Sequence, residues 1–183
     1  MPGVRCEDVS VAYTWGSTAA ERAMSLPCDR YLDAPEQVLH RAIDVDAPAA
    51  VVFRWLCQLR VAPYSYDWID NFGRTSPRTL TPGLERLAVG QTAMTMFELV
   101  EFEEGRHVTC VLRRGRRLFG ALAVTYAVLP RGDTRSRLLV RVLARFPRGP
   151  VGWVERWFLP WADLVMMRKQ LLTLRDLAER HAG

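Results

Sequence analysis

The sequence lacks long apolar runs and the short motifs that assign a chemistry directly. No stretch of about 18 or more apolar residues is present, so no segment is expected to span a bilayer. The chain has no G-x-S-x-G elbow, no phosphate-binding P-loop and no G-x-G-x-x-G dinucleotide motif. The opening residues, MPGVRCEDVS, contain no apolar core of the signal-peptide kind. We therefore expect a cytoplasmic protein.

Cysteine is scarce and scattered, and lysine is almost absent. The four cysteines form no C-x-x-C pair, and the three histidines form no cluster with them beyond the single neighbours His107 and Cys110. Because zinc ligands need tight local spacing, we expect no metal, no cofactor and reduced thiols. Lys169 is the single lysine, so arginine carries the net charge of +5. These arginines are spread from Arg5 to Arg180 among acidic residues, whereas a nucleic-acid-binding stripe would be concentrated. No nucleic-acid partner is expected.

What the sequence does contain fits one globular domain. Its 183 residues are 49% hydrophobic and 25% charged, which is enough to build a single core. Residues 1–37 are weakly patterned and are predicted to be an N-terminal extension that packs on a domain formed by residues 38–183. Within the extension, Val9, Val11 and Tyr13 alternate with polar or small residues and indicate a short strand.

Hydrophobic periodicity predicts the elements of the domain. Asp46 or Pro48 is expected to start the first helix, and Pro160 to kink or divide the last one. The expected helices cover 49–59, 66–72 and 151–181, a loop covers 73–88, and the expected strands cover 38–46, 90–102, 106–114, 118–129 and 135–146. Hairpin-length turns make the sheet antiparallel. This pattern predicts an α+β fold, in which the last helix crosses a curved sheet and encloses a hydrophobic cavity.

The chain resembles a known superfamily in several stretches. Ile43-Asp-Val-Asp-Ala-Pro-Ala-Ala-Val-Val-Phe-Arg-Trp-Leu56 and Met166-Met-Arg-Lys-Gln-Leu-Leu172 resemble the START-like proteins, also called SRPBCC, helix-grip or Bet v 1-like. Tyr64-Ser-Tyr-Asp-Trp-Ile-Asp-Asn71, followed by Arg74 and Leu87-Ala-Val-Gly90, resembles a bacterial subgroup described as polyketide cyclase/dehydrase-like or lipid-transport-like. The resemblance covers residues 38–181.

The resemblance implies a cavity for an apolar or aromatic ligand, and it implies no single reaction. This fold hosts carriers, receptors, cyclases and ring-hydroxylase domains. A ring-hydroxylase domain needs a companion iron–sulfur domain and His/Asp metal ligands, and this chain shows neither.

Three residues are candidates for acid–base chemistry. Asp67 and Tyr66 suit proton transfer in an aldol-type cyclisation, and Arg113 suits an oxyanion. The alternative is that Asp67 caps or pairs locally while its aromatic neighbours seal the rim of a pocket. Arg113 and Glu98 either point into the cavity as an ion pair or lie on a solvated strand face. The strand register decides between these two positions.

Large apolar side chains supply the candidates for ligand binding. Trp153, Trp157, Phe158 and Trp161 recur at helical spacing and suit a planar ligand, the core or a homodimer contact. Methionines suit either an adaptable pocket wall or ordinary core packing. The full set is Trp55, Tyr64, Trp68, Met94, Met96, Glu98, Trp157, Phe158, Trp161, Met167 and Leu171.

Three functions remain open on the sequence. The first is a carrier that holds a lipid, a polyketide-like molecule or an aromatic molecule by apolar burial. The second is a cyclase or dehydratase that folds a polyketide-like chain and brings its reacting carbons together. The third is an interaction protein that forms a homodimer through Trp153, Trp157 and Trp161.

Overall fold

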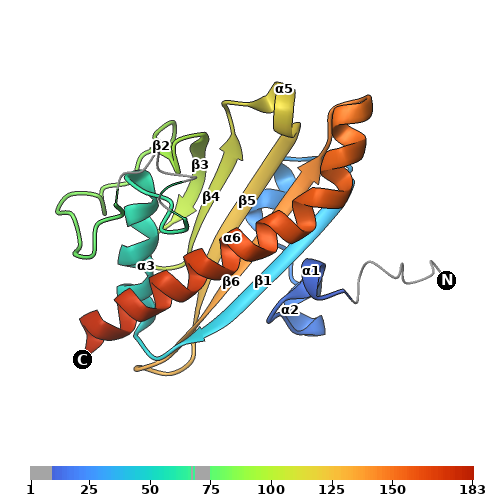
Figure 1. Ribbon diagram of the computed structural model, residues 1–183. Helices are drawn as coiled ribbons and strands as arrows, with labels where there is room; N and C mark the ends of the chain where they lie inside the picture. The colour runs from blue at the N-terminus through green and yellow to red at the C-terminus, as the bar shows by residue number, and fades with distance from the viewer. Residues whose placement is uncertain (1–9, 67, 69–74) are drawn as a thin grey trace.

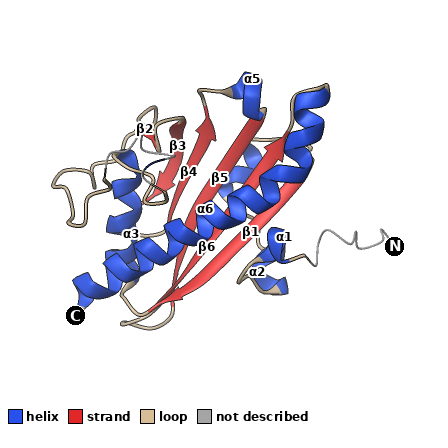
Figure 2. Ribbon diagram, viewed as in Figure 1, coloured by secondary structure: helices blue, strands red, loops and turns tan. Residues whose placement is uncertain are grey.

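The sheet and the helix that crosses it define the architecture. The computed structural model describes residues 10–66, 68 and 75–183. Within these residues, six strands form one antiparallel sheet in the order β1-β6-β5-β4-β3-β2. The long helix α6 runs diagonally across one face of this sheet (Figures 1 and 2). The predicted α+β, helix-grip arrangement is confirmed.

The strands follow the predicted alternation, with two differences. Residues Arg116–Phe119 form the short helix α5, so the strand expected from 118 starts at Ala121. The strand expected over 90–102 is interrupted because Met94 and Thr95 have φ angles of 47° and 62°, outside the extended region. The strands are β1 (Gln37–Val45), β2 (Thr92–Ala93), β3 (Phe97–Glu103), β4 (His107–Leu112), β5 (Ala121–Pro130) and β6 (Ser136–Arg145).

The helices differ from expectation mainly near the N-terminus. The strand predicted around Val11 and Tyr13 is wrong: the Ser10 hydroxyl accepts a hydrogen bond from the Ala12 amide and starts a helix instead. The helix predicted over 66–72 falls largely outside the described residues. The helical segments are α1 (Val11–Thr14), α2 (Ala19–Ala23), η2 (Pro27–Arg30), α3 (Ala49–Cys57), η3 (Gln58–Arg60), α5 (Arg116–Phe119) and α6 (Pro150–Ala182).

Pro160 bends α6 without dividing it. The helix is continuous from Pro150 to Ala182, and its first turns angle away from the rest in Figure 1. Proline has no amide hydrogen, so the carbonyl of Arg156, four residues earlier, loses its helical donor. The Gln37 side-chain amide of β1 donates to that carbonyl at 2.7 Å. The strand therefore satisfies the group that the proline leaves without a partner.

The two faces of the sheet are covered by different parts of the chain. The inner face meets α3 and α6 and carries the main core, which includes Leu39, Val140 and Leu171. The outer face is covered by η2, with Cys28 packed in a second cluster. The segment before β1 wraps one edge of the sheet, where the Trp15 carbonyl accepts a hydrogen bond from Ala42 of β1.

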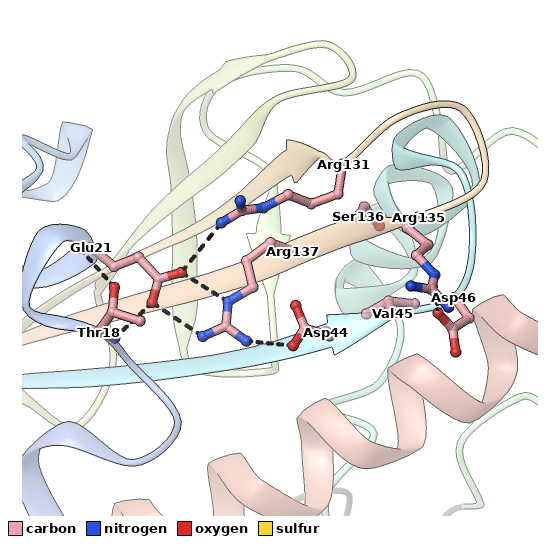
Figure 3. A pocket seen from close by; sticks show the side chains of 9 residues that line it. All are labelled: Thr18, Glu21, Asp44, Val45, Asp46, Arg131, Arg135, Ser136 and Arg137. Carbon is pink, nitrogen blue, oxygen red and sulfur yellow. Dashed lines mark hydrogen bonds and ion pairs between the residues drawn. The ribbon is translucent and has the colours of Figure 1, made fainter.

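Arginines of β6 hold the N-terminal segment on the outer face. Arg137 pairs with Glu21 at 2.9 Å, and Arg141 pairs with Asp29 at 2.7 Å. Arg141 also donates to the carbonyls of Arg22 and Met24. Figure 3 shows Arg137 between Glu21 and Asp44. Arg137 and Arg141, which alternate along β6, thus form a largely buried face that anchors the N-terminal segment.

Candidate functional site

Four polar side chains lie buried on the inner side, between α6 and the sheet. They are Arg41 of β1, Tyr126 of β5, and Asp163 and Gln170 of α6, and we call them the inner polar cluster. Strand alternation directs Arg41 and Tyr126 inward. Asp163 and Gln170 are seven residues apart, which places them on the same face of the helix. Buried polar groups surrounded by apolar side chains are candidates for ligand recognition.

Tyr126 and Gln170 form the first half of the inner polar cluster. The Tyr126 hydroxyl donates to Oε1 of Gln170 at 2.8 Å, and the Gln170 amide donates to the Pro63 carbonyl at 2.5 Å. Burial raises the pKa of Tyr126 well above its ordinary value. The phenol therefore keeps its proton and acts as a hydrogen-bond donor in an apolar setting.

Methionine sulfur atoms contact this hydrogen-bonded pair, and an aromatic pair lies in the same core. The sulfur atoms of Met94 and Met167 lie 3.4 and 3.7 Å from the Tyr126 hydroxyl. The rings of Trp55 and Tyr64 meet edge to face, with centroids 6.1 Å apart. Unbranched methionine side chains adjust more readily than branched ones, so this wall can accommodate different shapes.

The loops that bring Tyr64 and Met94 to the cluster have unusual backbones. Tyr64, Met94 and Thr95 have φ angles of 57°, 47° and 62°. Such left-handed positions in residues other than glycine cost about 1–3 kcal/mol each and concentrate at binding and catalytic sites. The Met94 amide donates to the Leu59 carbonyl at 2.8 Å, which ties the two loops together.

Arg41 and Asp163 form the second half of the inner polar cluster. Their side chains pair at 2.8 Å, and they are 0% and 13% exposed. Arg41 also donates to the Ala12 carbonyl at 2.8 Å. Burial raises the pKa of Asp163 to about 6, although Arg41 opposes that shift. A carboxyl group that titrates near neutral pH inside a protein is suited to proton transfer.

The structure brings together five of the predicted ligand-binding residues. Trp55, Tyr64, Met167 and Leu171 are buried in the core, and the partly buried Met94 packs against it. Met96 lies in the loop between β2 and β3 and is only partly buried. Tyr66 is half-buried, and Asp67 lies outside the described residues.

Other predicted site residues lie away from the inner polar cluster. Arg113 and Glu98 do form the predicted ion pair, but the register places Glu98 opposite Val111 on the outer face. Trp157, Phe158 and Trp161 point outward from α6, and Trp68 is 75% exposed. Helical spacing correctly placed the aromatic residues of α6 on one face of the helix. That face points to solvent, and the opposite face, which carries Asp163, points toward the protein.

Sequence reasoning missed all four members of the inner polar cluster. The available signals were a lone arginine in the apolar alternation of β1 and a glutamine among the apolar positions of α6. Tyr126 stands in a largely apolar run and gives no such signal. The side chains around the inner polar cluster are packed against one another. The ligand cavity that the sequence indicated therefore remains a prediction.

An open, charged hollow of about 560 Å³ lies elsewhere, near the turn between β5 and β6 (Figure 3). Arg135 faces Asp46 at 2.9 Å, and Arg137 is shared by Glu21 and Asp44. Both guanidinium groups are thus already paired with carboxylates. The hollow carries no unmatched charge pattern that identifies a ligand.

Comparison with known proteins identifies the fold. No family model matches the sequence, and no curated protein matches it. The Zhui aromatase/cyclase from Streptomyces sp. R1128 is 14% identical with a TM-score of 0.54, over 80% of this chain and 96% of that one. The protein TTHA0849 from Thermus thermophilus is 15% identical with a TM-score of 0.52, over 80% and 99%. The di-domain StfQ from the steffimycin pathway is 14% identical with a TM-score of 0.53, over 80% and 51%.

Proposed function

Starting from the helix-grip fold of the START-like superfamily, which this chain has, we propose that the protein is a carrier for a hydrophobic small molecule. The ligand is a lipid, a polyketide-like molecule or an aromatic molecule, and it occupies the interior between α6 and the sheet. The observation that carries the proposal is the Tyr126–Gln170 pair, a hydrogen-bonding unit packed among the apolar side chains of the main core.

The chemistry of this unit supports a ligand with one hydrogen-bond acceptor. Tyr126 keeps its proton, so its hydroxyl can turn from Gln170 to a carbonyl or hydroxyl oxygen of the ligand. The rest of the ligand gains about 25 cal/mol for each Å² of apolar surface that it buries. Affinity thus comes from burial and orientation from Tyr126.

Movable side chains and loops support a route to the interior. Met94 and Met167 lie against the hydroxyl and can shift between rotamers at low cost. Both Tyr64 and Met94 belong to loops with left-handed backbone, which release strain when they relax. In this proposal the ligand enters by displacing the two methionines and loosening the loops that carry Tyr64 and Met94.

A neutral fluorescent ketone, 6-propionyl-2-dimethylaminonaphthalene, tests this site because it is apolar and has one carbonyl acceptor. We expect saturable, blue-shifted binding to the wild type. Tyr126→Phe should weaken the affinity about tenfold, the value of one buried hydrogen bond. Tyr31→Phe, on the outer face, should leave the affinity unchanged. Mass spectrometry of the purified protein would identify a co-purified natural ligand.

The exposed aromatics of α6 provide the second control for dye binding. If Trp157→Ala abolishes binding while Tyr126→Phe does not, the dye occupies the outer surface and the interior site is wrong. The absence of any saturable binding by the wild type would also reject the proposal.

A cyclase or dehydratase acting on a polyketide-like substrate is the alternative, and Asp163 favours it. Its carboxyl group has a pKa of about 6 and lies in the interior that also holds the Tyr126 donor. A base that removes a proton next to one ketone and a donor that polarises another would drive an aldol condensation with loss of water. Tyr66 and Asp67 remain further candidates as acid and base, whereas Arg113 lies on the outer face.

An assay with a poly-β-ketone thioester as substrate distinguishes the two functions. A cyclase should convert it into a product lighter by one water molecule, and Asp163→Asn should stop that conversion while ketone-dye binding persists. A carrier should bind the thioester and return it unchanged.

A further inference from the structure

The first half of α6, residues 150–166, turns its apolar side outward. Trp157 and Phe158 are 72% and 68% exposed. Their charged neighbours point the other way, since Arg156 pairs with Glu36 and Asp163 with Arg41. We call the outward side the aromatic face, and its members are Trp153, Val154, Trp157, Phe158, Trp161 and Val165.

The aromatic face is one continuous stripe. Positions 154, 158, 161 and 165 follow the three- and four-residue spacing of a single side of a helix, and Trp153 and Trp157 extend it. Large apolar groups gathered in this way mark a surface that another apolar phase covers. No helix of the described residues is long and apolar enough to cross a membrane, so a covering bilayer would be contacted from its surface.

A group of arginines lies at the same end of the sheet, and we call it the arginine tip: Arg113, Arg114, Arg116, Arg117 and Arg148. The α5 helix contacts α6, and the two lie side by side at one end of the molecule in Figure 1. Leu118, in the same short helix as Arg116 and Arg117, is also exposed.

The chain segments that carry the arginine tip contain no carboxylate. The sequence has no Asp or Glu from 105 to 132 or from 134 to 154. Arg113 pairs with Glu98, and no carboxylate of the described residues forms an ion pair with Arg114, Arg116, Arg117 or Arg148. The aromatic face therefore lies beside an arginine tip in which only Arg113 has a carboxylate partner among the described residues. This arrangement complements a surface with an apolar interior and an anionic exterior.

From this juxtaposition we infer that the aromatic face and the arginine tip dock the protein onto an anionic lipid bilayer. The tryptophan rings lie at the level of the headgroups, which is the position that tryptophan prefers. The arginines pair with lipid phosphates and carboxylates. A second copy of this chain fits less well, because it carries the same net positive charge, whereas an anionic bilayer offers the opposite charge to the arginine tip.

Vesicle co-sedimentation of the full chain tests the inference, with tryptophan emission as a second signal. We expect binding to vesicles of 70% phosphatidylcholine and 30% phosphatidylserine, a blue shift of the emission, and loss of binding in 0.5 M NaCl. Pure phosphatidylcholine vesicles should bind weakly. Each arginine near an anionic surface contributes about fivefold to the partition coefficient.

Matched variants locate the contact. Arg116→Glu/Arg117→Glu should lower the partition coefficient at least twentyfold, whereas Lys169→Glu/Arg180→Glu changes the net charge equally and should have a much smaller effect. Trp157→Ala/Phe158→Ala should remove the blue shift and most binding. Trp68→Ala removes an exposed tryptophan outside the aromatic face and should leave both signals in place.

Two results would overturn the inference. One is that the wild type stays in the supernatant with anionic vesicles at low salt. The other is that sedimentation equilibrium shows a dimer that Trp157→Ala converts to a monomer, which would assign the aromatic face to a second copy. Neither result depends on whether the interior binds the ketone dye, so the inference and the proposed carrier function can fail separately.

Discussion

The two halves of α6 are amphipathic in opposite senses. In the second half, residues 167–182, Leu171 and Leu174 are buried while Lys169 and Arg180 face solvent. In the first half Trp157 faces solvent and Asp163 faces the protein. The comparison shows that one helix can contribute to the hydrophobic core with one half and present a binding surface with the other.

Polar contacts hold the first half of α6 in place where apolar packing does not. Gln37 binds the Arg156 carbonyl, Arg156 pairs with Glu36, and Arg41 pairs with Asp163. Hydrogen bonds and ion pairs are directional, so they can hold the helix against the sheet while its apolar side remains free. Replacing individual contacts in each half should therefore have very different effects.

The largest loss of stability is expected from replacing Arg41 of β1, which pairs with Asp163 near the end of the first half of α6. Arg41→Met leaves the Asp163 carboxylate buried without its cation, which should cost about 3–5 kcal/mol at pH 8. The control Arg145→Met removes an exposed arginine that donates to the Asp33 carbonyl, and it should cost under about 0.5 kcal/mol. Urea unfolding of both variants measures these costs.

The pH dependence of the Arg41→Met effect follows from Asp163. Its folded pKa of about 6 exceeds the ordinary value of 3.8, so the folded state holds the proton more tightly. The stability that this group contributes therefore falls as pH rises from about 4 to about 6. Without Arg41 the folded pKa rises further and the fall continues to higher pH. The variant should lose less stability at pH 5 than at pH 8, and a pH-independent loss would contradict the role of Asp163.

A matched pair of truncations compares the two halves directly. Leu174→Ala, in the second half, should lower the free energy of unfolding by about 2–5 kcal/mol because it opens a cavity in the core. Trp157→Ala, in the first half, should change it by less than about 0.5 kcal/mol because the side chain is exposed. Similar losses in the two variants would mean that the aromatic face packs against something in the isolated protein.

The smallest of these effects is expected at the Pro160 bend. Gln37→Leu leaves the Arg156 carbonyl without its side-chain donor and should cost about 1–2 kcal/mol. Adding Pro160→Ala restores a backbone amide hydrogen that can donate to the same carbonyl. The double variant should then be more stable than the sum of the single changes predicts, a coupling that a double-mutant cycle measures. If the two changes in the free energy of unfolding simply add, the Arg156 carbonyl does not need Gln37 as its donor.

The regular elements were largely predictable, and their interruptions were not. The spacing of Val52, Trp55 and Leu56 predicts α3, and the alternation of Leu138 and Val140 predicts β6. The break at Met94 and Thr95 has no comparable signal, because left-handed backbone in these residue types depends on contacts such as that between Met94 and Leu59. The helix at Val11–Thr14 shows that a single capping hydroxyl can outweigh a short alternation.

The candidate site was predictable in part. Met94 and Met167 were expected near a ligand, and their sulfur atoms lie beside the Tyr126 hydroxyl. Tyr126 and Gln170 were missed because they are 44 residues apart and only folding brings them within 2.8 Å. Arg113 and Glu98 were assigned either to the cavity, as an ion pair or ligand anchor, or to a solvated strand face, and the register places their pair on the outer face.

The amino-acid order alone determined the period of each element and therefore which side chains share a face. It determined that Trp157, Phe158 and Trp161 lie together, and that Arg137 and Arg141 do. The tertiary structure decided what covers each face: carboxylates of the N-terminal segment cover the arginines, and no described residue buries the aromatics. Periodicity is a local property of the backbone, whereas burial depends on segments far away in the chain.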